Sequence, residues 1–224
     1  MSGLIWLSPD GVFYTVQGEG KFVGVPSVFV RLSGCNLRCA WRNPDGTETR
    51  CDTPYTSFNA VGTKVAWQTV RDQITSFNCE HVVVTGGEPL MQRRGVDLIN
   101  DLAGSRLVTV ETNGTYDRDL DSRVFLSVSP KLTSAGASPI VPAMILKHEY
   151  QLKFVVNTEA DIAEIDQLVD KHTVPASNVY LMPQGTEPSQ FDSRLPWIVD
   201  LAKARGYRVS DRLHIRIWGS RRGV

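Results

Sequence analysis

Short runs of β-branched and aromatic residues recur along the 224-residue chain, and stretches with helical periodicity separate several of them. The runs predict strands over 28–33, 81–85, 106–111, 124–129, 151–156, 178–182 and 213–218. Two apolar stripes at helical spacing lie between strands, one made of Trp67, Val70, Ile74 and Phe77 and the other of Ile162, Ile165, Leu168 and Val169. This alternation predicts an α/β fold with a mostly parallel sheet. Because fewer than eight strand–helix repeats are predicted, we expect a modified, partial (β/α) barrel and not a closed one.

The domain organisation follows from length and from the distribution of prolines. A chain of this size can bury one substantial core, so residues 1–224 are expected to form a single domain. The segment 134–149 is the most loop-like stretch, and its two prolines argue against a regular helix through it. It is either a lid or a long connection.

The charge balance limits the classes of partner. Lysine plus arginine equals aspartate plus glutamate at 24 each, and the pI is about 6.9, so we expect no nucleic-acid partner. No apolar run approaches the roughly 20 residues of a membrane span, and the first residues do not form a basic segment followed by an apolar one. A cytoplasmic location without a membrane partner is expected.

Three of the four cysteines, Cys35, Cys39 and Cys51, lie within seventeen positions. In a reducing compartment such clusters are metal ligands or catalytic groups more often than disulfides. With residues 42–50 lifted out, CNLRCAW joins CDTPYT, which resembles the cluster-binding motif of radical S-adenosylmethionine enzymes. Arg42 then stands in the place of the third cysteine. An insertion of this length costs only about 1 kcal/mol in closure entropy, and the predicted turn at 43–46 would return the chain to Cys51.

Two other interpretations of the cysteines remain open. The thiols could form a zinc site with Cys79 or His81 as the fourth ligand, or they could be small buried hydrophobes. Three thiolates on a four-iron cluster instead leave one iron free for another ligand. Cys79 itself is interpreted as a buried structural thiol.

A second motif, TGGEPL, follows the strand predicted at 81–85. Gly86 and Gly87 allow close approach of the backbone to a ligand, and Glu88 can accept hydrogen bonds from the amino group of a methionine moiety. Taken alone, a Gly-Gly pair after a strand is usually a turn. Polar residues also follow or end three later strands, at 111–114, 129–131 and Lys153, and together they indicate a lined cleft.

A third group lies near the N-terminus and comprises Gln17, Glu19 and Arg31. In a strand, Arg31 shares the less apolar face with Phe29 and Ser33, and its guanidinium suits bidentate binding of a carboxylate. The carboxylate of Glu19 could accept the paired NH groups of an aminopyrimidine, and Gln17 offers both a donor and an acceptor. Alternatively, Gln17 and Glu19 could lie in the polar tip of a hairpin, and Arg31 could form a surface ion pair.

The motifs together resemble the 7-carboxy-7-deazaguanine synthase family of radical S-adenosylmethionine enzymes. They run in order along nearly the whole chain as VQGEG, FVRLSGCNLRC, CDTPYT, VVVTGGEPL, ETNGT, SPK, QLKFVV, MPQG and LHIRIWGSRRGV. The resemblance implies a lyase of queuosine-type deazapurine biosynthesis. Its reaction converts 6-carboxy-5,6,7,8-tetrahydropterin to 7-carboxy-7-deazaguanine with release of ammonia. It also implies a homodimer and an electron-donating reductase or flavodoxin-like partner.

The resemblance further implies a role for individual residues. The 4Fe-4S cluster would be held by Cys35, Cys39 and Cys51, and its reduction would cleave S-adenosylmethionine to a radical that takes a hydrogen atom from the pterin. The residues implied to contact S-adenosylmethionine are Cys51, Asp52, Gly86, Gly87, Glu88, Thr112, Ser129, Pro130, Lys131, Lys153 and Gln184. The residues implied to contact the pterin are Val16, Gln17, Gly18, Glu19, Arg31, Thr85, His214 and the terminal carboxylate of Val224. Thr53 is the implied Mg²⁺ ligand.

Two alternative functions belong to other classes. A glycyl-radical activase would share the cysteines and TGGEP but would not need Gln17, Glu19 or Arg31. A zinc-stabilised interaction module would be colourless and would not cleave S-adenosylmethionine.

Overall fold

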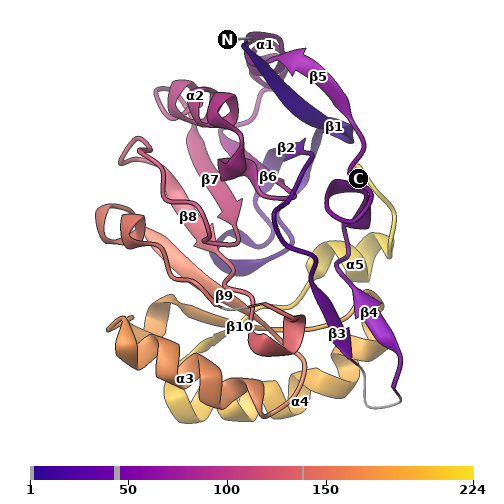
Figure 1. Ribbon diagram of the computed structural model, residues 1–224, viewed down its shortest axis with the longest axis vertical. Coiled ribbons are helices and arrows are strands. Elements are labelled where there is room, and N and C mark those ends of the chain that lie inside the picture. The colour runs from indigo at the N-terminus through magenta and orange to yellow at the C-terminus, as the bar shows by residue number, and fades with distance from the viewer. Residues whose placement is uncertain (1–2, 43–45, 138) are drawn as a thin grey trace.

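The computed structural model describes residues 3–42, 46–137 and 139–224. Nine of its strands form one sheet in the order β11-β10-β9-β8-β7-β6-β2-β1-β5 (Figure 1). The strands are β1 (Leu4–Val16), β2 (Pro26–Leu32), β5 (Thr63–Ala66), β6 (His81–Gly86), β7 (Leu107–Thr112), β8 (Phe125–Val128), β9 (Tyr150–Val156), β10 (Val179–Pro183) and β11 (Arg208–Val209). Neighbours from β2 through β11 are parallel, and β1 pairs antiparallel with both β2 and β5. The expected mostly parallel sheet is confirmed, and over the described residues it does not close into a barrel.

Five α-helices accompany the sheet: α1 (Trp67–Thr75), α2 (Arg93–Leu102), α3 (Asp161–Lys171), α4 (Pro188–Arg205) and α5 (Leu213–Trp218). The two helical stripes predicted from the sequence fall on α1 and α3, where Val70 and Ile165 are among the buried positions. The ends of α4 follow ordinary capping rules, because Glu187 and Gln190 form a capping box and Gly206 ends the helix in the left-handed conformation. None of the helices in the described ranges has the length and apolarity needed to cross a bilayer.

Alternation along the strands gives the sheet two chemically different faces. In β2, Val28, Val30 and Leu32 are fully buried, whereas Phe29 and Arg31 line a cavity on the opposite side. Fully burying each such aliphatic side chain contributes about 1.5–3 kcal/mol. The apolar core between sheet and helices includes Val82, Val84, Val108, Val110, Leu126, Val128, Leu152, Phe154, Val156, Val179 and Leu181 from strands, with Val70, Ile74, Leu98, Ile99, Leu102, Ile162, Ile165, Leu168, Ile198 and Ala202 from helices.

The strand predicted at 213–218 is wrong, because this segment is α5. Apolar residues alternate there with polar ones, which is typical of a strand, but only Ile215 is buried and Ile217 is 52% exposed. The segment starts where the amide of Leu213 donates to the carbonyl oxygen of Gly18, so a contact distant in sequence sets its conformation. The other predicted strands lie within two residues of the observed ones. The described part of 134–149 contains only 3-10 turns, as its prolines predict.

The segment between Cys39 and Cys51 is a β-hairpin. Strand β3 (Ala40–Arg42) pairs antiparallel with β4 (Glu48–Arg50), and Ala40 lies opposite Arg50. Of the turn predicted at 43–46, residues 43–45 lie outside the described residues. The hairpin explains how an insertion can interrupt the cysteine motif, since its two ends meet at the cysteines themselves.

His81 and Cys79 are fixed by partners far from the other cysteines. The two ring nitrogens of His81 pair with the hydroxyls of Ser27 and Thr109 at 2.7 and 2.8 Å. The thiol of Cys79 donates to the carbonyl oxygens of Pro26 and His81 at 3.4 and 3.3 Å. Both residues lie at the start of β6, whereas the cysteine loop follows the end of β2, so these contacts oppose a zinc site that combines them with the loop.

Burial lowers the pKa of His81 to about 4, against 6.5 for a free histidine. A histidine kept neutral by the fold stabilises the protein above the unfolded pKa and loses this contribution as pH falls. We therefore expect the unfolding free energy to decrease by about 1.4 kcal/mol per pH unit between about pH 6 and pH 5 through this residue. Urea unfolding of the wild type and of His81→Asn at several pH values measures it. An unchanged slope in the variant would contradict the assignment.

Candidate active site

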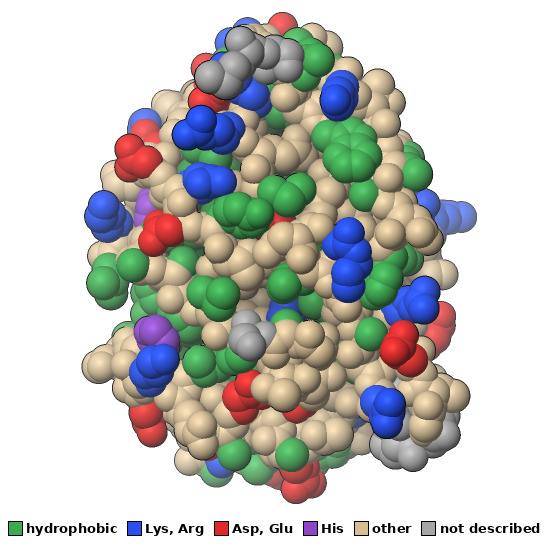
Figure 2. All heavy atoms as spheres, viewed as in Figure 1, with side chains coloured by type: hydrophobic (Ala, Val, Ile, Leu, Met, Phe, Trp, Pro, Cys, Tyr) green, Lys and Arg blue, Asp and Glu red, His purple; other side chains and the backbone are tan. Residues whose placement is uncertain are grey.

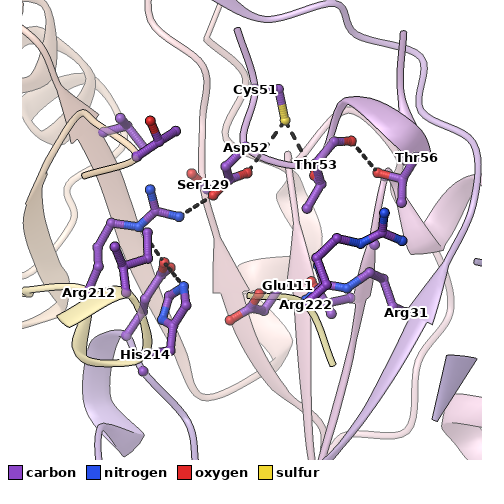
Figure 3. Close-up of a pocket in the computed structure, with 18 of the residues that line it drawn as sticks. Arg31, Cys51, Asp52, Thr53, Thr56, Glu111, Ser129, Arg212, His214 and Arg222 are labelled. Carbon is purple, nitrogen blue, oxygen red and sulfur yellow. Dashed lines mark hydrogen bonds and ion pairs between the residues drawn. The ribbon is translucent and has the colours of Figure 1, made fainter. Parts of the chain in front are cut away.

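A cavity of about 310 Å³ opens on the face of the sheet opposite the helices. Strand residues from this face form one part of its wall, and the loops that follow β2, β6, β7, β8 and β10 form another. Ligand sites in parallel α/β proteins gather at the carboxyl ends of strands. Figure 3 shows the cavity with Cys51, Asp52 and Thr53 above Arg212, His214 and Glu111.

The three cysteines of the loop all line this cavity, and all are free thiols. The amide of Cys51 donates to the carbonyl oxygen of Cys39 at 3.0 Å, which closes the base of the β3–β4 hairpin. The Cys35 sulfur accepts from the amide of Leu37 at 3.4 Å. The hairpin thus returns Cys51 beside Cys39 despite the eleven intervening residues.

Burial raises the pKa of Cys35 and Cys39, and it raises that of Cys51 to about 11. The positive charge of Lys131 acts on all three thiols in the opposite sense, which places this ammonium among them. Iron–sulfur ligation needs thiolates. A nearby cation that favours the thiolate form therefore fits a metal-binding loop.

The three thiols do not form a preformed site for a single metal ion in the described part of the chain. Within the described residues, no three histidine, cysteine, aspartate or glutamate side chains converge closely enough to hold one metal ion. In a four-iron cluster each thiolate binds a different iron, so the three sulfurs need only surround a shared space. The donor set of three cysteines in one cavity meets that requirement.

The TGGEPL motif stabilises the backbone next to the cysteine loop. Gly86 has a φ of +133°, and a Cβ there would lie 1.9 Å from the carbonyl oxygen of Leu32, so only glycine fits where β6 meets the end of β2. Glu88 is fully buried and accepts from the amides of Leu90 and Asn113 at 3.0 and 2.7 Å. Its carboxylate stabilises the loop behind the cavity wall.

Four buried side-chain atoms of residues that line the cavity have no hydrogen-bond partner in the described part of the chain. They are Oγ1 of Thr15, Nε of Arg31, Nε1 of Trp41 in the hairpin and Oε1 of Gln184 after β10. Leaving such atoms unpaired costs about 1–3 kcal/mol each. A polar ligand in the cavity would satisfy them.

A buried network of charges forms the floor. Lys153 from β9 pairs with Glu19 and lies 3.8 Å from Glu111 of β7. Glu111 accepts from the side-chain amide of Gln17 at 3.1 Å and from the hydroxyl of Thr85 at 2.9 Å. The predicted pterin residues Gln17, Glu19 and Thr85 are thus joined through Glu111 and Lys153. This network draws on β6, β7, β9 and the loop after β1.

Arg212 connects this floor to the cysteine loop. Its guanidinium donates to Glu19 at 3.0 Å and to the carbonyl oxygen of Gly185 at 2.6 Å, and it also pairs with Asp52 (Figure 3). Burial alone would raise the pKa of Glu19, but the charges of Lys153 and Arg212 hold it well below its usual value. The floor of the cavity therefore carries an ionised carboxylate at neutral pH.

His214 lies on α5 and not on the predicted strand, and it still lines the cavity. Its ring packs against Gly18, where a Cβ would lie 2.1 Å from Nδ1, so the glycine makes room for the imidazole. Burial lowers the pKa of His214, although Glu19 acts to raise it. The ring nitrogen Nε2 lies 4.0 Å from the Glu19 carboxylate.

Most of the site residues implied by the sequence lie at this one cavity. Those that line it are Val16, Gln17, Gly18, Glu19, Arg31, Cys35, Cys39, Cys51, Asp52, Thr53, Thr85, Gly86, Gly87, Thr112, Ser129, Lys131, Lys153, Gln184, His214 and Val224. Glu88 and Pro130 are not among the lining residues. Arg212 also lines the cavity but was not predicted, because the only sequence signal was a basic residue before LHIRIW.

The open, mostly parallel sheet with three thiols in the loop after β2 defines a fold of the radical S-adenosylmethionine type. No family model matches the chain. The 7-carboxy-7-deazaguanine synthase of Rhodopirellula baltica is 38% identical over 95% of this chain and 86% of its own length. That of Pyrobaculum aerophilum is 39% identical over 95% of each. The crystal structure of QueE from Escherichia coli superposes with a TM-score of 0.70 at 25% identity, covering 94% of this chain and 95% of that one. The chain belongs to the 7-carboxy-7-deazaguanine synthase family.

Proposed function

We propose that the cavity described above converts 6-carboxy-5,6,7,8-tetrahydropterin to 7-carboxy-7-deazaguanine with release of ammonia. The observation that carries this proposal is the meeting of two sets of residues in one cavity. Three free thiols lie in the loop after β2, and a buried charged floor is built from β7, β9 and the segment before α5. An enzyme of this family needs both, one for its cofactors and one for its pterin.

The residues around the thiols would hold the cofactors. Cys35, Cys39 and Cys51 would ligate a 4Fe-4S cluster. S-adenosylmethionine would lie against the backbone at Gly87 and the unpaired amide oxygen of Gln184. When bound, the cluster and S-adenosylmethionine supply the radical that starts the ring contraction, and Mg²⁺ supplies a hard cation for a carboxylate.

Thr53 would offer an oxygen ligand to Mg²⁺. Its hydroxyl oxygen lies 3.4 Å from the Cys51 sulfur, and the residue lines the cavity between the cysteine loop and the floor. The neighbouring Asp52 carboxylate is held by Arg212. A cation at Thr53 would therefore lie between the cofactor residues and the pterin residues.

The floor would bind and orient the pterin. The ionised Glu19 would accept from the paired NH groups of the aminopyrimidine ring, and Gln17 would add a donor and an acceptor. Arg31 would pair with the substrate carboxylate. Because Lys153 and Arg212 keep Glu19 ionised, they preserve its acceptor character at neutral pH.

We further propose that residues 1–224 form one domain with an insertion at 42–50, since the nine strands share one sheet and the insertion is a hairpin. The chain is proposed to act in the cytoplasm as a homodimer and to receive electrons from a reductase or a flavodoxin-like protein. Acidic and basic side chains are both scattered over the face in Figure 2, which supports the expectation of no nucleic-acid partner. Sedimentation of the purified protein tests the dimer.

The test compares wild type and Glu19→Gln after anaerobic reconstitution with iron and sulfide. Assays contain a reductant, S-adenosylmethionine, Mg²⁺ and the carboxy-tetrahydropterin, and products are read by mass spectrometry. We expect the wild type to form 7-carboxy-7-deazaguanine. Glu19→Gln should bind the cluster but lose at least about tenfold in kcat/KM, since about 1.4 kcal/mol of binding corresponds to a factor of ten. Full activity of Glu19→Gln would contradict the role given to this carboxylate.

A further inference from the structure

Asp10 is a buried carboxylate that lies in an irregularity of β1. The strand pairs regularly with β2 from Val12 onward, but the register shifts between Leu7 and Val12. Leu7 lies opposite Leu32 and Val12 opposite Val30, so the extra residues of β1 face the position of Arg31. A bulge of this kind re-aims side chains, and the Asp10 side chain is only 6% exposed.

Three side chains from distant parts of the chain meet at this carboxylate. Nε of Arg31 lies 3.2 Å from Oδ2 of Asp10, and the hydroxyl of Tyr55 donates to the same oxygen. Nε and Nη2 of Arg222 donate to Oδ1 at 3.0 and 2.6 Å. The Arg222 guanidinium also stacks on the Tyr55 ring, with its central carbon 3.5 Å from the ring centroid.

The three partners connect different parts of the cavity wall. Arg31 comes from β2, Tyr55 follows Thr53 in the cysteine loop, and Arg222 belongs to the last segment of the chain, and all three line the cavity. Figure 3 shows Arg31 and Arg222 on one side of the cavity, across from Arg212 and His214. Figure 1 places the C-terminal end of the described chain close to the loop that carries Tyr55.

We propose that Asp10 is a positioning residue that holds Arg31 and the segment 219–224 at the cavity for an anionic substrate. Arg31, Arg222 and Asp10 together carry a net charge of plus one, so the two guanidinium groups can attract a substrate carboxylate. Without Asp10, the two guanidinium groups would repel each other. The segment 219–224 would then lose its ion pair to β1.

The proposal rests on the proposed function, because the anion in question is the substrate carboxylate. It adds a residue that touches neither the substrate nor the cofactors. Asp10 acts through Arg31 and Arg222, so its removal should alter substrate binding more than the chemical step.

The test uses Asp10→Asn and Arg222→Gln in the reconstituted enzyme. Each variant is expected to raise KM for the carboxy-tetrahydropterin at least tenfold while kcat changes less than threefold. Because both break the same ion pair, the double variant should raise KM no further than the larger single effect.

Hydrogen exchange in residues 219–224 should accelerate at least tenfold in Asp10→Asn. The side chain of Arg222 is 46% exposed, so Arg222→Gln provides the test if Asp10→Asn does not fold.

Asp166 offers a matched control. It accepts from Nε of Arg205 at 2.8 Å and from the hydroxyl of Tyr207 at 2.9 Å, and none of these residues lines the cavity. Asp166→Asn therefore removes a similar cluster and should leave KM within twofold of the wild type. Equal KM values for wild type and the Asp10 and Arg222 variants, with unchanged exchange, would overturn the proposal. A wild type that does not convert the pterin would refute the proposed function, and the exchange measurement would then decide whether Asp10 holds the segment.

Discussion

A Cys51→Ala variant is expected to fold and yet to bind no stable iron–sulfur cluster and to cleave no S-adenosylmethionine. Cys51 directly follows β4, beside Cys39; its sulfur contacts Thr53 and Asp52, and the side chain packs against a small cluster that includes Cys39 and Trp41. Removing that sulfur leaves the hairpin pairing intact. It leaves two thiols where three are needed, so iron content, brown colour and turnover should all be lost.

Cys79→Ala is the matched control for this result. Its thiol donates to the backbone carbonyl oxygens of Pro26 and His81, at the starts of β2 and β6, and Cys79 does not line the cavity. The variant should bind as much iron per chain as the wild type. Iron analysis and the visible spectrum of the two reconstituted variants make the comparison. A Cys51→Ala protein with full iron content would remove this residue from the cluster site.

Among the variants proposed for this protein, Arg212→Met should lose the most unfolding free energy. The Arg212 side chain is 8% exposed and that of Glu19 is 11% exposed, so the substitution leaves a buried carboxylate short of one of its cationic partners. Breaking a buried pair on one side typically costs about 3–5 kcal/mol. Asp52 would also lose its partner beside the cysteine loop. We expect turnover to fall together with the unfolding free energy.

Arg123→Met provides the comparison. Arg123 pairs with Asp121 at 2.7 Å, but its side chain is 60% exposed, and because water screens such a pair its loss should cost far less stability. Urea unfolding of both variants at pH 7 measures the difference. Equal losses in the two variants would show that the Arg212 network is no stronger than a surface ion pair.

The sequence was sufficient to predict the sheet because its strands are buried on a helix-covered face. The run HVVVT has three consecutive valines and is buried from His81 to Thr85 in β6, and such a run indicates a buried parallel strand. The cysteine motif could also be recognised from the sequence, although residues 42–50 interrupt it. Insertions between ligands cost little, and the structure provides a hairpin whose ends meet at Cys39 and Cys51.

The parts that could not be predicted depend on contacts between distant residues. The segment 213–218 has strand-like alternation, but its docking against Gly18 makes it helical. Arg212 and Asp10 carry no local motif, and each gains its importance only where buried charges from three parts of the chain meet. The contact predicted between Glu88 and S-adenosylmethionine stays a prediction, and the buried Glu88 carboxylate accepts from Leu90, Thr112 and Asn113.

Product analysis of the reconstituted wild-type protein shows directly whether the chain converts the pterin. The protein is incubated anaerobically with reductant, S-adenosylmethionine, Mg²⁺ and 6-carboxy-5,6,7,8-tetrahydropterin, and mass spectrometry follows both organic substrates. We predict that 7-carboxy-7-deazaguanine accumulates over repeated turnovers. Recovery of intact pterin from a protein that holds its cluster and cleaves S-adenosylmethionine would contradict the substrate assignment. A colourless, zinc-containing protein would contradict the cluster site itself.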